Sequence, residues 1–172
     1  MAGRLAGGDL SVRMPERGVG EIGALERSFN SMAGALEDGR DQLGRLADEQ
    51  AALRRVATLV AQRVPPVEVF ATVAEEVGRL LGTEGAGIVR YEPDNTTTLV
   101  AGWSRDGDHM PVGSRFPIER HSLSDLVLRT GRPARIDRYA DAPGAVAAVV
   151  RQLGTRSAVS CPIRVEGALW GI

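Results

Sequence analysis

The 172-residue chain has a formal net charge of −1 at pH 7, so no strongly basic surface favours nucleic acid, and we expect no nucleic-acid partner. Its cationic residues are all arginine, which excludes enzyme classes that need a lysine, such as P-loop nucleotide hydrolases and Schiff-base enzymes. Apolar residues make up 43%, which predicts a buried core, while the single cysteine excludes an internal disulfide and no stretch approaches the ~18–20 apolar residues that cross a bilayer.

Residues 1–20 are rich in glycine and are interrupted by Pro15. Glycine and proline break regular structure and are typical of turns and connectors. We therefore expect a short helical remnant at the start of this stretch, followed by an extended connector.

Residues 21–63 have apolar side chains that repeat with the heptad period, with Ile22 at position a, and only Gly39 and Gln50 interrupt the repeat. A repeat of this length favours a coiled coil, and the expected partner is a second copy of the chain. Glu49 and Arg54 are placed to pair across a parallel homodimer. The residues expected at the dimer seam are Ile22, Leu25, Phe29, Met32, Leu36, Leu43, Leu46 and Leu53.

This helix is not built for maximum stability. Gly34, Gly39 and Gly44 lie inside it, and each costs about 1 kcal/mol relative to alanine. Two interpretations stay open: relaxed selection on a linker, or a helix kept marginally stable so that a signal can shift it.

After Pro65-Pro66, which ends the long helix, the pattern predicts a compact α/β region. A helix over 67–81 has one apolar face, and its members are Val69, Phe70, Val73, Val77, Leu80 and Leu81. Strands over 87–91 and 96–103 form a hairpin, and a third short strand covers 115–118.

The remaining elements follow from capping and turn residues. Ser122 caps a helix that ends at Gly131, a strand covers 134–136, and Pro143 opens a helix that Gly154 closes. Strands over 158–163 and 168–172 form a last hairpin. The pattern stops within that strand, so we expect a truncated part of a longer protein whose output domain is missing.

Residues 3–37 resemble the second half of a HAMP linker. The resemblance rests on Gly8–Arg13, Pro15-Glu16, Gly20–Leu25 and Ser28–Met32. Glu21 matches the acidic residue that opens the family's second helix, and Phe29, Asn30 and Met32 match that helix's signature. The resemblance implies a partial HAMP linker over 1–37 and a signalling coiled-coil helix over 38–63.

Residues 52–172 resemble a GAF domain. The resemblance rests on Leu53–Ala57, Glu75–Leu81, Leu126–Ile136 and Ser157–Ile172. It implies an α+β fold, in which a long N-terminal coiled-coil helix is followed by a GAF-like antiparallel sheet flanked by helices and truncated at its C-terminus. The order HAMP, coiled coil, GAF is similar to that of membrane-anchored sensor histidine kinases. It implies a location on the cytoplasmic side of the membrane and a response regulator that the missing kinase core would phosphorylate.

The motifs that suggest chemistry are weak. Residues 18–23 fit G-x-G-x-x-G, but no strand precedes them, which argues against a dinucleotide site. His109 and His121 lack the context of a phosphoacceptor, and no spacing predicts a metal site. We expect Cys161 to lie in mid-strand as a buried free thiol, and because Pro162 follows it where bilin-binding relatives usually have histidine, no covalent pigment is expected.

No catalytic residue, cofactor site or metal site can be assigned from these patterns. The weak pocket candidates are Trp103, His121 and Cys161. The leading hypothesis is a signal relay through a homodimer. The alternative is a small-molecule-binding GAF module of a cyclic-dinucleotide cyclase or phosphatase receptor, with an effector bound in the GAF domain.

Overall fold

The computed structural model describes residues 9–172, so the expected helical remnant near the N-terminus lies outside the described residues. Contacts divide the chain into two units, Met1–Arg54 and Arg55–Ile172. Helix α2, Glu21–Ala61, makes up most of the first unit, and its last two turns belong to the second. It continues through Gly34, Gly39 and Gly44, as the heptad pattern predicts.

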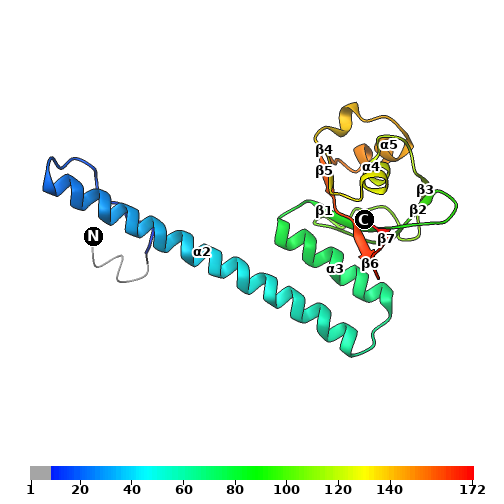
Figure 1. Cartoon of the computed structure of the whole chain (residues 1–172), viewed down its shortest axis with the longest axis horizontal. Coiled ribbons are helices and arrows are strands. Elements are labelled where there is room, and N and C mark those ends of the chain that lie inside the picture. Colours follow the sequence, from blue (N-terminus) through cyan, green and yellow to red (C-terminus); the bar gives the residue numbers. More distant parts are fainter. Residues whose placement is uncertain (1–8) are drawn as a thin grey trace. The chain divides into compact units, whose positions relative to one another are not determined.

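The second unit contains three further α-helices, one 3₁₀ turn and seven strands among its residues, all of which are described (Figure 1). The helices are α3 (Pro66–Leu81), α4 (Leu123–Thr130) and α5 (Ala145–Gln152), with the turn η1 at Tyr139–Asp141. The strands are β1 (Gly85–Tyr91), β2 (Thr96–Ser104), β3 (Arg115–Pro117), β4 (Ala134–Ile136), β5 (Ala158–Ser160), β6 (Ile163–Val165) and β7 (Ala168–Gly171).

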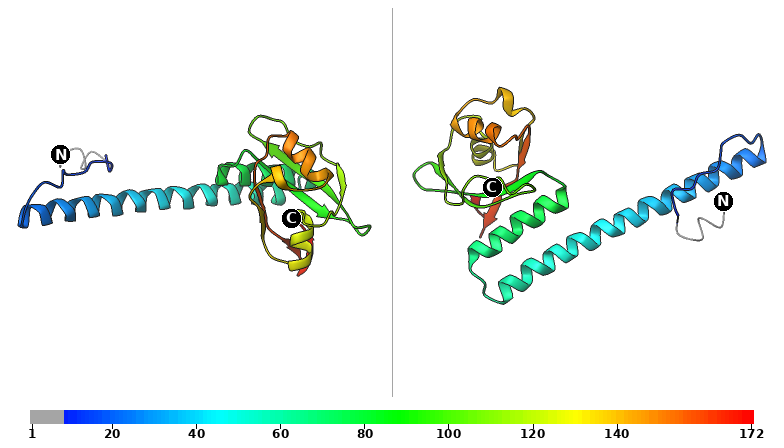
Figure 2. Two further views of the ribbon diagram at one scale, coloured as in Figure 1. Left: turned by 90° about the horizontal axis from the view of Figure 1, so that it is seen from above. Right: turned by 180° about the vertical axis from the view of Figure 1, so that it is seen from behind.

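Five strands form one antiparallel sheet in the order β3-β2-β1-β7-β6, and β4 and β5 pair separately. The β1–β2 hairpin is the longest pairing, with a register shift between Ile88 and Val89. Helix α3 lies along one face of the sheet, and α4 and α5 lie on the other (Figures 1 and 2). This confirms the expected α+β fold with an antiparallel sheet flanked by helices.

The core beneath the sheet is built around small side chains. Ala74 of α3 packs with Ile88 and Ala101 of the sheet, and larger partly buried side chains surround them. A Cβ atom at Gly78 would lie 2.2 Å from the indole of Trp103, so that ring lies directly against the helix backbone. Because Gly78 has no side chain, the large aromatic ring packs where a Cβ would collide with it.

The expected apolar face of α3 is only partly correct. Phe70 and Val73 do pack against the core, whereas Val77, Leu80 and Leu81 are exposed. The buried residues of the helix are Ala74, Glu76 and Gly78. In the second half of α3, the apolar pattern predicted the wrong residues to be buried. The helix comes close to the sheet there, and only residues with small side chains, Ala74 and Gly78, fit between them.

The expected strand over 158–163 is also wrong. Ala158–Ser160 pairs with β4, Ile163–Val165 pairs with β7, and the chain changes sheet at Cys161-Pro162. Proline has no N–H to donate to a strand ladder, so it suits such a break. A turn at Glu166-Gly167, with positive φ at both residues, joins β6 to β7.

The capping residues predicted the ends of α4 correctly. The Ser122 hydroxyl accepts a hydrogen bond from the Asp125 N–H at the start of α4, and Gly131 ends that helix in the left-handed conformation. Helix α5 begins at Ala145, two residues later than expected from Pro143, because Gly144 has a positive φ of 101°, which is outside the helical region.

Candidate functional site

The connector that precedes α2 is bound to it by polar side chains of the helix. The Met14 N–H donates to Asn30 Oδ1 at 2.7 Å, and Asn30 Nδ2 donates to the Met14 carbonyl at 3.0 Å. Arg13 pairs with Glu37 at 2.6 Å, and the Gly18 N–H donates to Glu26 at 2.8 Å. The connector therefore follows α2 over about three turns, from Glu26 to Glu37.

These contacts use one stripe of the helix. Glu26, Asn30 and Glu37 fall at heptad positions e and b, as do the buried Gly23 and Ala33. A Cβ at Gly23 would lie 2.2 Å from the Gly18 carbonyl oxygen. The glycines of the G-x-G-x-x-G match thus allow a close contact between α2 and the connector.

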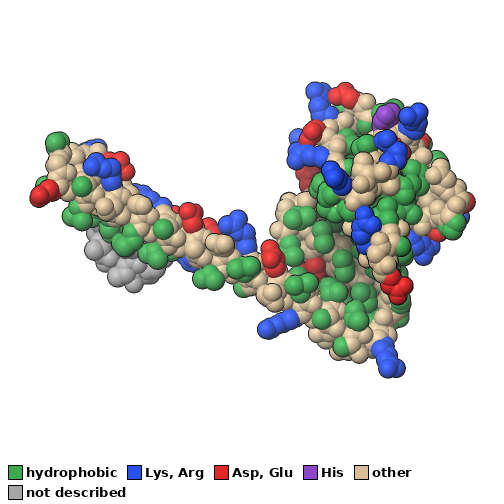
Figure 3. All heavy atoms as spheres, viewed as in Figure 1, with side chains coloured by type: hydrophobic (Ala, Val, Ile, Leu, Met, Phe, Trp, Pro, Cys, Tyr) green, Lys and Arg blue, Asp and Glu red, His purple; other side chains and the backbone are tan. Residues whose placement is uncertain are grey.

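The a and d stripe next to it is not covered. Ile22, Leu25 and Leu43 expose about two thirds of their surface, at 66%, 65% and 68%. Hydrophobic side chains recur along α2 in Figure 3. Of the expected seam residues, Phe29 is half-buried and the other seven are exposed. The dimer itself stays a prediction.

A second polar contact joins the end of α2 to α3. Arg55 donates from Nε and Nη2 to the two carboxylate oxygens of Glu76, each at 2.6 Å. Glu76 is only 6% exposed. The hydrogen bond from Arg55 holds the pKa of Glu76 below its usual value, against the opposing effect of burial.

The three pocket candidates named from the sequence do not form a site. Trp103 packs against the core beside α3. His121 is exposed ahead of α4, and its N–H donates to Asp125. Cys161 is exposed between β5 and β6, which corrects the expectation of a buried thiol in mid-strand. No hydrogen bond or ion pair joins any two of these three described residues.

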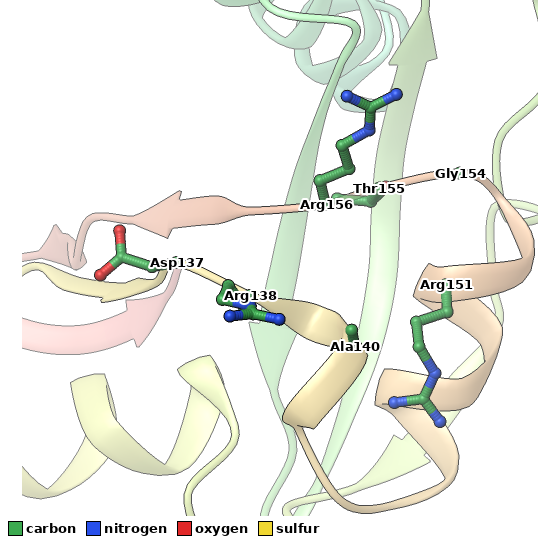
Figure 4. Close-up of a pocket in the computed structure, with 7 residues that line it drawn as sticks. All are labelled: Asp137, Arg138, Ala140, Arg151, Gly154, Thr155 and Arg156. Carbon is green, nitrogen blue, oxygen red and sulfur yellow. The ribbon is translucent and has the colours of Figure 1, made fainter.

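The second unit does have a hollow that sequence reasoning missed. It measures about 560 Å³ and lies where η1, the end of α5 and the segment before β5 meet (Figure 4). Its lining residues are Asp137, Arg138, Ala140, Arg151, Gly154, Thr155 and Arg156. The guanidinium of Arg151 donates to the carbonyls of Tyr139 and Ala142, which ties η1 to α5. In Figure 4 the three arginines point in different directions.

On the opposite side of the sheet from α3, a tyrosine connects β1 to α4. The Tyr91 hydroxyl donates to the Ser124 carbonyl at 2.8 Å. Burial, with a smaller contribution from the Asp125 carboxylate, raises the pKa of Tyr91 to about 12. The phenol therefore stays protonated and acts as a structural hydrogen-bond donor at neutral pH.

Within residues 9–172, no group of three or more His, Cys, Asp and Glu side chains gathers in a way that would hold a metal ion. Within the same range, no helix is both long enough and apolar enough to span a bilayer. His109 is exposed, and its Nδ1 lies 2.8 Å from the Met110 carbonyl.

Arg55 and Glu76 were the main residues that the sequence did not single out. Both sit in polar, helix-forming surroundings, where such residues are usually solvated. One feature of the sequence could have indicated that Glu76 is buried. It lies two positions from both Ala74 and Gly78, whose small size allows α3 to pack closely.

Family models match two parts of the chain. The model of the HAMP domain matches residues 1–38, and the model of the GAF domain matches residues 65–172. No match was found among curated proteins. The HAMP-then-GAF order inferred from the sequence is thereby confirmed.

Solved structures agree on the fold. The phycocyanobilin-bound GAF domain of a cyanobacterial phytochrome is 22% identical with a TM-score of 0.55, over 71% of this chain and 75% of that one. Residues 122 to 287 of a methyl-accepting chemotaxis protein are 23% identical with a TM-score of 0.56, over 70% and 78%. A GAF domain of A. aeolicus in an inactive state is 16% identical with a TM-score of 0.55, over 74% and 77%.

TM-scores of 0.55 to 0.56 show that the chain shares its fold with these three structures. The GAF model covers more than half of the chain. The HAMP and GAF matches together indicate a sensory module of signal transduction. The chain belongs to the GAF domain family, with a HAMP segment preceding the GAF domain.

Proposed function

We propose that this chain is the signal-relay and sensory part of a bacterial sensor histidine kinase. A stimulus received at the membrane would move the HAMP segment, and a dimeric α2 would transmit that movement to the GAF domain. The order of HAMP and GAF segments supports this role, because both families are regulatory and neither supplies catalysis. In this proposal the HAMP segment lies at the cytoplasmic side of the membrane.

The observation that supports a dimeric relay is the uncovered seam on α2. The connector covers the b and e stripe of the helix, yet the apolar a and d stripe beside it faces solvent. A continuous exposed apolar stripe on one helix is unfavourable in water. A second copy with the same stripe would bury it by knobs-into-holes packing.

The relay would work by a change between two packing states of similar energy. Helix pairs switch by small rotations or shifts at their interface, and a signal needs only to favour one state over the other. Gly34, Gly39 and Gly44 inside α2 lower the stability of any single arrangement. They fit a helix whose packing has to change.

Sedimentation analysis of the full chain tests the seam. Leu36→Asp places a charge in the seam and should convert a dimer to a monomer, because an unpaired buried carboxylate is costly. Ser31→Asp adds the same charge at an exposed position c, away from the seam, and should leave the dimer intact. If the Leu36→Asp variant sediments like the unmodified chain, the seam assignment is wrong.

The kinase assignment concerns the parent receptor and not a segment of this chain. It predicts that the parent receptor autophosphorylates on histidine and transfers the phosphoryl group to a response regulator. A phosphotransfer assay on the parent receptor tests it. Cyclic-dinucleotide synthesis or phosphatase activity in place of phosphotransfer would favour the alternative receptor classes.

A second candidate function is small-molecule sensing by the GAF domain. The arginine-lined hollow of about 560 Å³ favours it, because its size suits a small ligand and its charge suits an anion. Citrate and inorganic phosphate are suitable probes in a thermal unfolding assay at constant ionic strength. A saturable rise in Tm that Arg156→Gln removes and Arg132→Gln retains would support this function, and a flat response would count against it.

A further inference from the structure

Glu76 is a charged residue in an unusual place. It is 6% exposed, and it lies on α3 between Ala74 and Gly78, the two residues by which that helix approaches the sheet. Burying a carboxylate is costly unless it is paired and hydrogen-bonded. Both of its oxygens accept bonds from Arg55, so the environment of Glu76 depends on one side chain from the end of α2.

Arg55 occupies the opposite face of α2 from the expected seam. With Ile22 at position a, Arg55 falls at position f, whereas Leu53 and Val60 fall at d. Leu53 and Val60 are 63% and 60% exposed, so the seam face of the helix is open at the level where Arg55 binds α3. The final turns of α2 therefore present two separate surfaces.

We propose that the Arg55–Glu76 pair is the contact by which α2 positions α3 under the sheet of the GAF domain. On this view α2 has a dimer seam on one face and a coupling contact on the opposite face, so a rotation of the helix acts on α3 through Arg55. The biological role of this contact rests on the proposed relay. Arg55 and Glu76 are positioning residues, since neither contacts a ligand.

The geometry of the pair suits this role. A guanidinium that binds both carboxylate oxygens fixes direction as well as distance, and a lysine ammonium cannot reproduce that fork. The other charged groups near Glu76 belong to α3 itself. Arg79 adds a favourable charge and pairs with Glu75 at 2.6 Å, one turn along the same helix. Those contacts stay within α3, so they do not connect it to α2.

Hydrogen exchange in the full chain tests the proposal. Glu76→Gln should speed the exchange of backbone amides at 55–61 of α2 about tenfold, because coupling between two elements is reciprocal. Glu75→Gln is the matched control, since it removes a carboxylate from the neighbouring position that pairs only within α3. Arg55→Lys retains the positive charge without the forked hydrogen bonds. It should therefore change the exchange rates of the α3 amides less than Glu76→Gln changes those of residues 55–61.

The amides of the β1–β2 hairpin separate coupling from general loss of stability. Selective acceleration in α2 with little change in β1 and β2 supports the proposal. Equal acceleration in all three elements, or an α2 response to Glu76→Gln no larger than that to Glu75→Gln, overturns it. Sedimentation of the same samples reports dimerisation independently. A monomeric chain would overturn the proposed relay, while the exchange pattern would still decide whether α2 and α3 are coupled.

Discussion

Asn30 binds both backbone polar groups of Met14: its Oδ1 accepts from the Met14 N–H at 2.7 Å, and its Nδ2 donates to the Met14 carbonyl at 3.0 Å. An asparagine side chain has one acceptor and one donor group, so it can satisfy a peptide unit in the way that a paired strand would. Asn30 of α2 thus holds the backbone of the connector at Met14, between the contacts that Glu26 and Glu37 make.

Asn30→Asp should loosen the connector. The carboxylate still accepts from the Met14 N–H, but it has no donor for the Met14 carbonyl and lies near the Glu16 carboxylate, to which Asn30 Nδ2 donates at 3.1 Å. We expect a loss of about 1–2 kcal/mol in the local stability of the connector. Hydrogen exchange of the amides at 12–18 measures it. Ser31→Asp adds the same charge at the next, exposed position and should leave that exchange unchanged.

Gly78→Ala should destabilise the GAF domain. Alanine is favoured over glycine in a helix by about 1 kcal/mol, but its Cβ here would lie 2.2 Å from the Trp103 ring, and overpacking costs about 1–3 kcal/mol. The second effect should exceed the first. Gly44→Ala is the matched control, because no atom lies within 4 Å of the added Cβ, and it should be stabilising. Urea unfolding compares the two, and a stabilised Gly78→Ala variant would contradict the packing described above.

Acid should destabilise the second unit in part through Glu76. Its pKa in the folded chain is held below the ordinary value of 4.5, chiefly by the hydrogen bond from Arg55. A carboxyl with a lowered folded-state pKa stabilises the fold above its unfolded pKa, and this stabilisation is lost as pH falls through the folded-state pKa. Urea midpoints should therefore fall less steeply with acid in Glu76→Gln than in the unmodified chain. Glu75→Gln should retain the steeper dependence.

At high pH, Tyr91 should be the tyrosine that resists ionisation. Burial raises the pKa of Tyr91 to about 12, so it contributes stability that is complete below the unfolded pKa of 10.0 and is lost as pH rises toward 12. Phenolate absorbance should show a late titration step that Tyr91→Phe removes. Burial also raises the pKa of Tyr139, so Tyr139→Phe is needed as the comparison and should leave the late step in place. If the remaining tyrosine of the Tyr139→Phe variant ionised with a pKa near the ordinary value of 10.0, that result would contradict the burial of Tyr91.

Much of the local structure could be predicted from the sequence. The heptad repeat identified α2, Ser122 and Gly131 gave both ends of α4, and strand β4 was predicted with the bounds that the structure has. Each of these signals depends on residues within a few positions of one another. Periodicity and capping act through the backbone of one segment, so they are already present in a single sequence.

Only the tertiary structure decided which segments meet. It divided residues 158–163 between two sheets, left Cys161 exposed, buried Glu76 against Arg55, and gave the sheet-facing side of α3 to small residues. Partner choice depends on contacts between residues far apart in the chain, and its energy comes from close packing and from paired buried charges. A pattern within one segment does not show which distant residues that segment will contact. The sequence by itself therefore determined most of the elements and the apolar a and d stripe of α2, while the fold determined which polar residues hold the elements together.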